Sequence, residues 1–184
     1  TIFRITETHQ GFEVVFHELS SKKSEKVFED NRVEVFTIPL DHRIYCNGYL
    51  FKEKPKERHL NMQEISKYPE IEICDYHNLK RGKNIQLSDG YILKNENLTK
   101  PAEPSVSYAF CSDTRYFESI IPIIKNVDVL YHEATFLHDL KKMADYTGHT
   151  TALEAAKIAR KANVKKLILG HFSNRYNDLS VFLN

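Results

Sequence analysis

Four short polar clusters in the C-terminal part of this sequence carry side chains that could do chemistry. They are 111–115 (CSDTR), 131–135 (YHEAT), 148–151 (GHTT) and 170–176 (GHFSNRY). Each follows an apolar segment with the pattern of a strand or a helix. Asp, Glu and His at the ends of buried strands are the groups from which metal sites and acid/base sites are built. We therefore interpret residues 108–176 as half of a metal-hydrolase active site.

Three of these side chains are candidate metal ligands. Asp113 follows the predicted strand 106–111, His171 follows 165–169, and His42 follows 32–40 at a junction of the same type. Each has a structural alternative, because an Asp can cap a helix and a lone His can be a hydrogen-bonded structural residue. Imidazole and carboxylate together suit zinc or manganese.

A second group are candidates for acid/base chemistry. His132 and Glu133 follow the predicted strand 127–131, and His149 directly precedes a helix. A histidine oriented by a carboxylate can act as a proton shuttle, whereas the alternative is structural support around the ligands. Arg175 could hold a phosphate in a bidentate contact or be an ordinary surface residue.

Basic residues crowd the segment between the two halves of the chain. They are Lys52, Lys54, Lys56 and Arg58, followed by Lys80, Arg81 and Lys83. Such clusters suit backbone phosphates of a nucleic acid, and the alternative is a solvated charged loop.

The elements that must position these groups differ between the two halves. Short antiparallel strands are predicted at 12–19, 26–29, 32–40 and 44–51, with a hairpin at 85–93. Strands and helices then alternate: strands at 106–111, 127–131 and 165–169, and helices at 116–125, 136–146 and 151–162. The last helix is predicted from the capping box of Thr151 and Glu154. This order indicates an α/β (α+β) fold with a βαβ-type half packed against a meander.

Composition limits the class of protein. The 184 residues predict one domain, 1–184, with 52–90 as a possible substrate-binding insertion. A net charge of +1 provides no global basic field, so any nucleic-acid contact must be local. The three cysteines lack a CxxC pair and indicate free thiols in a reducing compartment, which predicts a cytoplasmic protein. The sequence contains no apolar run of membrane-spanning length.

Taken together, the four clusters resemble ribonuclease Z, the tRNA 3′-processing endonuclease family of the metallo-β-lactamase superfamily. The upstream segment 39–49 (PLDHRIYCNGY) looks like the His…Gly-Tyr segment of that family. The resemblance implies an αββα sandwich, of which only the C-terminal portion is present. It also implies two zinc ions, with manganese possible, and His42, Asp113 and His171 as ligands, Asp113 bridging both ions.

The resemblance implies a function as well. His132, Glu133 and His149 match positions associated with proton transfer to the leaving oxygen. The expected reaction is hydrolysis of the phosphodiester at the 3′ trailer of precursor tRNA by a metal-bridging hydroxide. Residues 52–90 would be the arm that grips the tRNA, and a homodimer is common in the family.

Two departures from the family pattern leave alternatives open. The His-x-His-x-Asp-His motif is absent, and none of the nine histidines forms an HxH pair, so we expect the remaining ligands upstream of Thr1. A Gly-Pro element common in the arm is also not evident. The alternatives are a hydrolase of the same fold acting on a small phosphodiester or sulfate ester, and a catalytically incomplete module that binds RNA or a partner.

Overall fold

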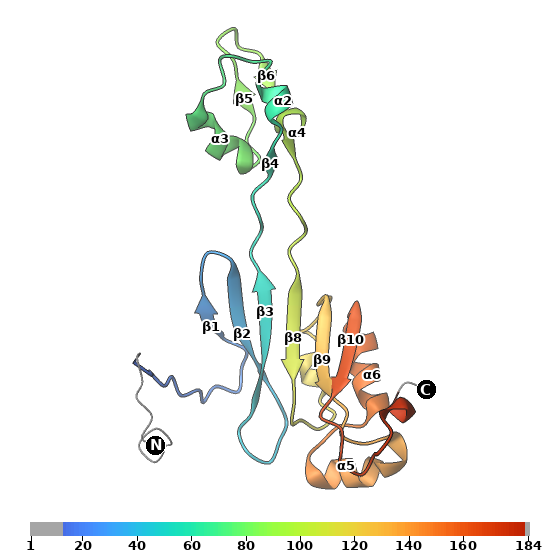
Figure 1. Cartoon of the computed structure of the whole chain (residues 1–184). Coiled ribbons are helices and arrows are strands. Elements are labelled where there is room, and N and C mark those ends of the chain that lie inside the picture. The colour runs from blue at the N-terminus through green and yellow to red at the C-terminus, as the bar shows by residue number, and fades with distance from the viewer. Residues whose placement is uncertain (1–12, 183–184) are drawn as a thin grey trace.

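The computed structural model describes residues 13–182, and its central feature is a six-stranded mixed sheet (Figure 1). The strand order is β1-β2-β3-β8-β9-β10. The strands are β1 (Lys26–Glu29), β2 (Val33–Pro39), β3 (Asn47–Glu53), β8 (Ser107–Cys111), β9 (Val129–Glu133) and β10 (Lys166–Gly170). Neighbouring strands from β1 to β8 run antiparallel, whereas β8, β9 and β10 run parallel to one another. The predicted meander and βαβ half are therefore joined in one sheet.

The contact between β3 and β8 depends on a glycine. A Cβ atom at Gly48 would lie 2.3 Å from the carbonyl oxygen of Phe110, far inside van der Waals contact. Gly48 lies within the segment 44–51 that was predicted as a strand, at a point where β3 and β8 approach each other closely. Only a residue without a side chain lets the two halves of the sheet approach this closely here.

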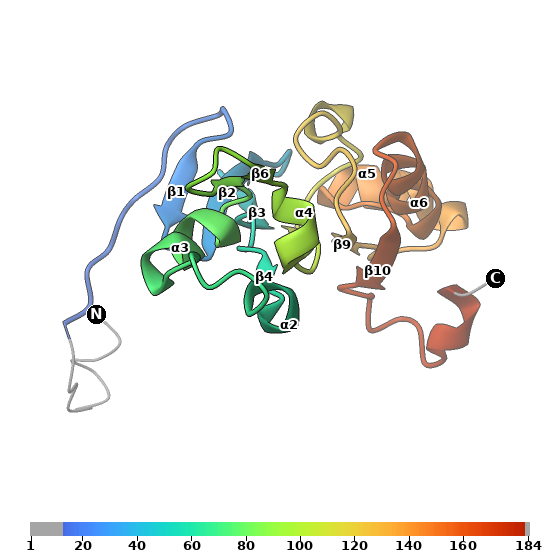
Figure 2. The same cartoon turned by 90° about the horizontal axis from the view of Figure 1, so that it is seen from above.

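Helix α6 (Ala152–Lys161) covers one face of the parallel strands, at the β9–β10 end of the sheet (Figure 2). It begins at Thr151, whose side chain accepts a hydrogen bond from Glu154 N in the predicted capping box. Ile158 and Ala162 pack with sheet residues such as Leu50 and Leu130 in one buried cluster. This core fixes the ends of the parallel strands, from which the candidate site is built.

The opposite face of the sheet is apolar and partly open. Phe51, Tyr108, Phe110 and Ile168 are between 36% and 40% exposed there. Phe110 stacks on Tyr131 with the ring centroids 4.7 Å apart. Large apolar side chains on one contiguous sheet face are typical of a surface that packs against another layer.

A projecting arm occupies residues 54–106, longer than the predicted 52–90 (Figure 1). Its elements are β4 (His59–Leu60), α2 (Met62–Ile65), α3 (Ile73–Lys80), β5 (Ile85–Gln86), β6 (Ile92–Leu93), α4 (Asn95–Leu98) and β7 (Thr99–Lys100). The arm has its own buried cluster, which includes Ile65, Leu79 and Leu98. It leaves the sheet after β3 and returns at β8, so it is an insertion between two paired strands.

Several element predictions differ from the structure. Residues 116–125 hold only a short 3-10 turn, η1 (Glu118–Ile120), because Pro122 cannot donate the hydrogen bond that a continuing helix needs. The segment 13–19 forms no strand, and Phe12 lies outside the described residues. The helix predicted at 136–146 is divided into η2 (His138–Leu140) and α5 (Lys141–Thr147). The chain also contains η3 (Leu179–Phe182). Within residues 13–182, every helix is too short or too polar to traverse a lipid bilayer.

Candidate active site

The parallel strands β8, β9 and β10 deliver their following loops to one edge of the sheet. Asp113 follows β8, His171 follows β10, and His149 lies between α5 and α6. One potential ligand atom from each of these three residues lies within 4.8 Å of the others. The carboxyl ends of parallel strands are the usual place for a site in layered folds. The structure thus brings together two predicted metal ligands and one predicted acid/base residue.

Two of the three residues have an unusual backbone conformation. Asp113 has φ of 55° and His171 has φ of 60°, both in the left-handed region that non-glycine residues seldom occupy. Each conformation turns the chain sharply where a strand ends. Nε2 of His171 consequently lies 3.4 Å from Oδ1 of Asp113. Conformations of this kind cost free energy and cluster at functional sites.

His42 reaches the same cluster from the loop between β2 and β3. Its ring centroid lies 5.5 Å from that of His149, and the ring of His149 lies 5.2 Å from that of His171. Nδ1 of His42 donates to the carbonyl oxygen of Gly148, 2.9 Å away, because a carbonyl can only accept. That hydrogen bond leaves Nε2 of His42 as the nitrogen available to a ligand.

Glu133 is the buried centre of the site. Its side chain has no exposed surface, and its carboxylate accepts four hydrogen bonds. Oε1 accepts from Thr114 N at 2.6 Å and His149 Nδ1 at 3.0 Å. Oε2 accepts from the Thr135 hydroxyl at 2.6 Å and Thr150 N at 3.1 Å. One carboxylate therefore ties the loops after β8 and β9 to the segment before α6.

His132 lies apart from this cluster. It is adjacent to Glu133 in β9, which ends at Glu133 instead of the predicted residue 131, and neighbouring strand residues point to opposite faces. His132 is fully buried, its Nδ1 contacts the carbonyl oxygen of Glu133 at 2.8 Å, and its Nε2 has no partner among the described residues. Burial lowers the pKa of His132 and favours the neutral ring. This environment suits a residue that supports the strand end.

The clustered residues fit a transition-metal ion. They offer imidazole nitrogens and a carboxylate oxygen, the donor set that zinc prefers among protein ligands. The hydrogen bonds of His42 and His149 engage Nδ1 and leave Nε2 of each ring without a described hydrogen bond. Within residues 13–182, Asp113, His149 and His171 form the single group of three or more potential ligands, enough for one ion.

Arg175 has a neighbour other than a carboxylate. Its guanidinium carbon lies 5.9 Å from the ring centroid of Phe136, within the range of a cation–π contact. The side chain is exposed and follows His171 by four residues. It therefore lies near the candidate site in the chain, with its charge open to solvent.

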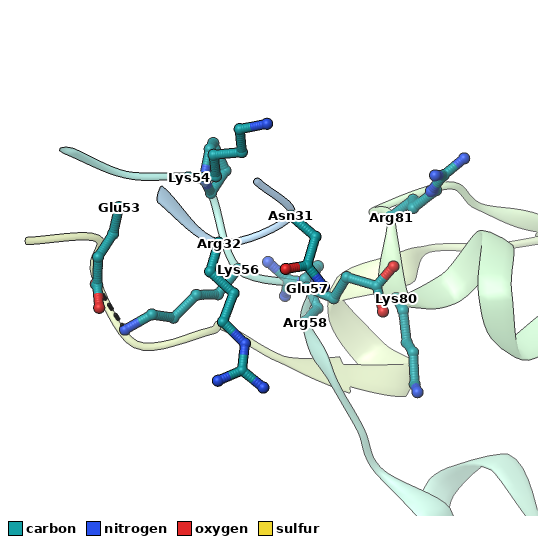
Figure 3. A pocket seen from close by; sticks show the side chains of 10 residues that line it. Asn31, Arg32, Glu53, Lys54, Lys56, Glu57, Arg58, Lys80 and Arg81 are labelled. Atoms are coloured by element: carbon teal, nitrogen blue, oxygen red, sulfur yellow. Dashed lines mark ion pairs between the residues drawn. The ribbon is translucent and has the colours of Figure 1, made fainter. Parts of the chain in front are cut away.

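A basic pocket of about 990 Å³ lies at the root of the arm (Figure 3). Its basic residues come from the β1–β2 turn, the outgoing stalk and the end of α3: Arg32, Lys54, Lys56, Arg58, Lys80 and Arg81. Lys54 pairs with Glu29, and Lys56 with Glu53 at 2.9 Å. No ion pair is formed by Arg32, Lys80 or Arg81 within residues 13–182. The structure gathers five of the predicted basic residues and adds Arg32, which comes from the body of the sheet.

Two predicted basic residues lie elsewhere. Lys52 extends over the ring of Phe36, 5.4 Å from its centroid, and Lys83 does not line the pocket. Sequence reasoning missed Arg32, and it also missed Thr135, whose hydroxyl lies 2.9 Å from Nδ1 of His171. Thr135 belongs to the same short cluster as Glu133, which was the one available signal. Arg32 is an isolated residue in a turn and gave none.

Comparison with known proteins finds relatives of this chain, although no family model matches the sequence. Ribonuclease Z of Porphyromonas gingivalis is 44% identical over 172 residues, which are 94% of this chain and 56% of that protein. The short form of human tRNase Z superposes with a TM-score of 0.53 at 21% identity, over 85% of this chain and 43% of the human chain. YhfI of Bacillus subtilis, a metallo-β-lactamase fold protein, superposes with a TM-score of 0.51 at 17% identity over 86% and 44% of the two chains. The two superpositions show the fold. The chain belongs to the ribonuclease Z family of the metallo-β-lactamase fold and spans about half the length of the relatives that it matches.

Proposed function

We propose that this chain forms the catalytic edge and the substrate arm of a zinc-dependent endoribonuclease that removes the 3′ trailer from precursor tRNA. The observation that carries the proposal is the Glu133 carboxylate, which holds His149 by a 3.0 Å hydrogen bond beside Asp113 and His171. A buried carboxylate, an oriented histidine and a ligand group at one sheet edge supply the parts needed for phosphodiester hydrolysis.

In this proposal the metal is held by His42, Asp113 and His171, completed by residues from the remaining length of the enzyme. Zinc is favoured over manganese because imidazole is the main donor. When bound, the metal activates water and stabilises negative charge on the phosphoryl oxygens. His42, Asp113 and His171 are three donors, fewer than two ions need, so in this proposal further ligands come from the remaining length of the enzyme.

His149 and Glu133 have the geometry of a proton-transfer pair. Nδ1–H of His149 donates to Oε1 of Glu133, which fixes the orientation of the ring. We infer that Nε2 of His149 delivers a proton to the 3′ oxygen that leaves the scissile phosphate. His132, predicted to share this chemistry, is assigned a positioning role instead, because it is buried on the other face and holds the Glu133 carbonyl.

The arm-root pocket is the proposed contact for the RNA backbone. Arg32, Lys80 and Arg81 project positive charge that no described carboxylate neutralises, and phosphates are the matching ligands. Arg175 would meet a phosphate nearer the cleavage point. The three free cysteines agree with a cytoplasmic enzyme, and a homodimer is expected from the family.

RNA binding can be measured on this chain by fluorescence anisotropy with labelled precursor tRNA at several salt concentrations. Arg32→Gln and Arg81→Gln should each weaken binding and reduce the slope of log affinity against log salt by about one. Lys157→Gln is the matched control, because Lys157 is an exposed lysine of α6 remote from the pocket. Equal effects of all three substitutions would refute the pocket as the contact.

Cleavage is tested in a protein that joins this chain to the remaining length of a ribonuclease Z. Asp113→Ala should abolish cleavage of precursor tRNA and lower the bound zinc measured by mass spectrometry. His149→Ala should slow cleavage while zinc is retained. Loss of zinc in the His149 variant would instead make His149 a ligand, which its place in the ligand group allows.

A further inference from the structure

We propose that Thr135 is a positioning residue that selects the tautomer of His171. This inference rests on the proposed function of the site. The Thr135 side chain is 7% exposed and lies between two groups of the active site. Its Oγ1 is 2.6 Å from Oε2 of Glu133 and 2.9 Å from Nδ1 of His171. No other described hydrogen bond engages this hydroxyl or the Nδ1 atom of His171.

The tautomer follows from counting protons. Glu133 accepts from two backbone N–H groups, Thr114 N and Thr150 N, and neither contact can be reversed. The carboxylate is therefore an acceptor, and the single hydrogen of the Thr135 hydroxyl is donated to it. The same hydroxyl can then only accept from Nδ1 of His171. His171 must consequently carry its proton on Nδ1 and leave the lone pair on Nε2.

This choice matters because Nε2 is the atom that faces the ligand cluster. Nε2 of His171 lies 3.4 Å from Oδ1 of Asp113 and would be the atom that binds a metal. A neutral imidazole can bind a metal only through the nitrogen without a proton. The free ring of a histidine is not held in either tautomer, and His171 is 40% exposed at its side chain, so burial alone does not fix it. The Thr135 hydroxyl supplies the fixing contact.

The chain of hydrogen bonds from Glu133 through Thr135 to His171, which we call the relay, also links the two functions of the site. Glu133 holds His149 through Oε1 and holds Thr135 through Oε2. The proposed proton-transfer residue and the proposed metal ligand are therefore oriented by opposite oxygens of one carboxylate. Thr135 transmits that orientation to His171 across the parallel β9–β10 edge, where Ser173 N donates to the Thr135 carbonyl at 3.0 Å.

The first test is nitrogen NMR of the histidine rings in the metal-free chain above pH 8. Nitrogen shifts distinguish the protonated ring nitrogen directly. In the unmodified chain, His171 should be protonated on Nδ1, and protonation on Nε2 would overturn the proposal without any variant. Thr135→Val, which keeps the shape and removes the hydroxyl, should move the His171 proton toward Nε2. Thr135→Ser should restore the original tautomer.

The second measurement is zinc affinity by competition with a chelator. Thr135→Val should weaken zinc binding by about tenfold or more, the usual effect of removing a partner of a ligand. Thr37→Val is the matched control, because Thr37 is also buried and its hydroxyl bonds only to backbone groups of residues 23–25. An equal loss in both variants would refute the relay. If the protein that joins this chain to the remaining length of a ribonuclease Z shows the predicted tautomers but binds no zinc, the result would support the relay and count against the proposed metal enzyme.

Discussion

Replacing Glu133 by Gln removes one hydrogen-bond acceptor from a fully buried side chain and tests the four hydrogen bonds assigned to its carboxylate. Each carboxylate oxygen accepts one bond from a backbone N–H and one from a side chain. A Gln side chain has one oxygen and one NH₂ group, so whichever way it turns, one backbone N–H meets a donor. Thr114 and Thr150 have no exposed surface, so water cannot replace the lost acceptor.

An unsatisfied buried donor costs about 1–3 kcal/mol. We therefore expect Glu133→Gln to lower the free energy of unfolding by about 1–3 kcal/mol. In urea denaturation the slope of this free energy against urea concentration should stay the same. Glu118→Gln is the control, because Glu118 is 49% exposed and its ion pair with Lys161 is at the surface. That variant should leave the free energy of unfolding nearly unchanged, because ion pairs at the surface contribute little. A Glu133 variant as stable as the unmodified chain would refute the four-bond description.

Three further predictions concern groups outside this network. Burial raises the pKa of Cys111 to about 12. In the folded chain at pH 8, iodoacetamide should therefore modify the exposed Cys74 and spare Cys111, which mass spectrometry can measure. Early modification of Cys111 would contradict its burial. The hydrogen bond from Lys165 holds the pKa of Asp128 at about 2, below the ordinary value of 3.8, so its stabilisation is complete above about pH 4 and is lost as the pH falls toward 2. Asp128→Asn should flatten that part of the stability profile, and an unchanged slope would exclude the contribution. Gly48→Ala should destabilise the chain by about 1–3 kcal/mol or more in thermal unfolding, because the new Cβ meets a backbone oxygen, and a neutral effect would mean that β3 can shift.

The sequence predicted those parts of the site that follow from local pattern. Asp113 and His171 were predicted to lie at one edge of the sheet, as they do, because each directly follows an apolar strand and parallel strands end at one edge. The helix after Thr151 was found because its capping box is a local signal. These inferences required no knowledge of distant contacts.

Other parts depended on contacts that no local pattern reports. His132 and Glu133 were treated as equivalent because the strand was ended at residue 131, whereas β9 continues to Glu133 and directs the two side chains to opposite faces. The role of Thr135 depends on which hydroxyl lies between Glu133 and His171. Arg32 joins the basic pocket only because the β1–β2 turn folds beside the stalk.

The placement of the arm fixes its distance from the ligand cluster. The arm leaves from the end of β3 and the start of β8, whereas the ligand cluster lies at the start of β3 and the end of β8. Seven residues of β3 at about 3.3 Å each separate the two ends by about 20 Å. A ligand shorter than this spacing can engage one end at a time, and a ligand that spans it gains from both through a raised effective concentration. Lengthening β3 and β8 by two residues each would keep every side chain on its face and move the two ends about 7 Å further apart. The distance between the arm and the ligand cluster is thus set by strand length, which selection or design can change in steps of two residues.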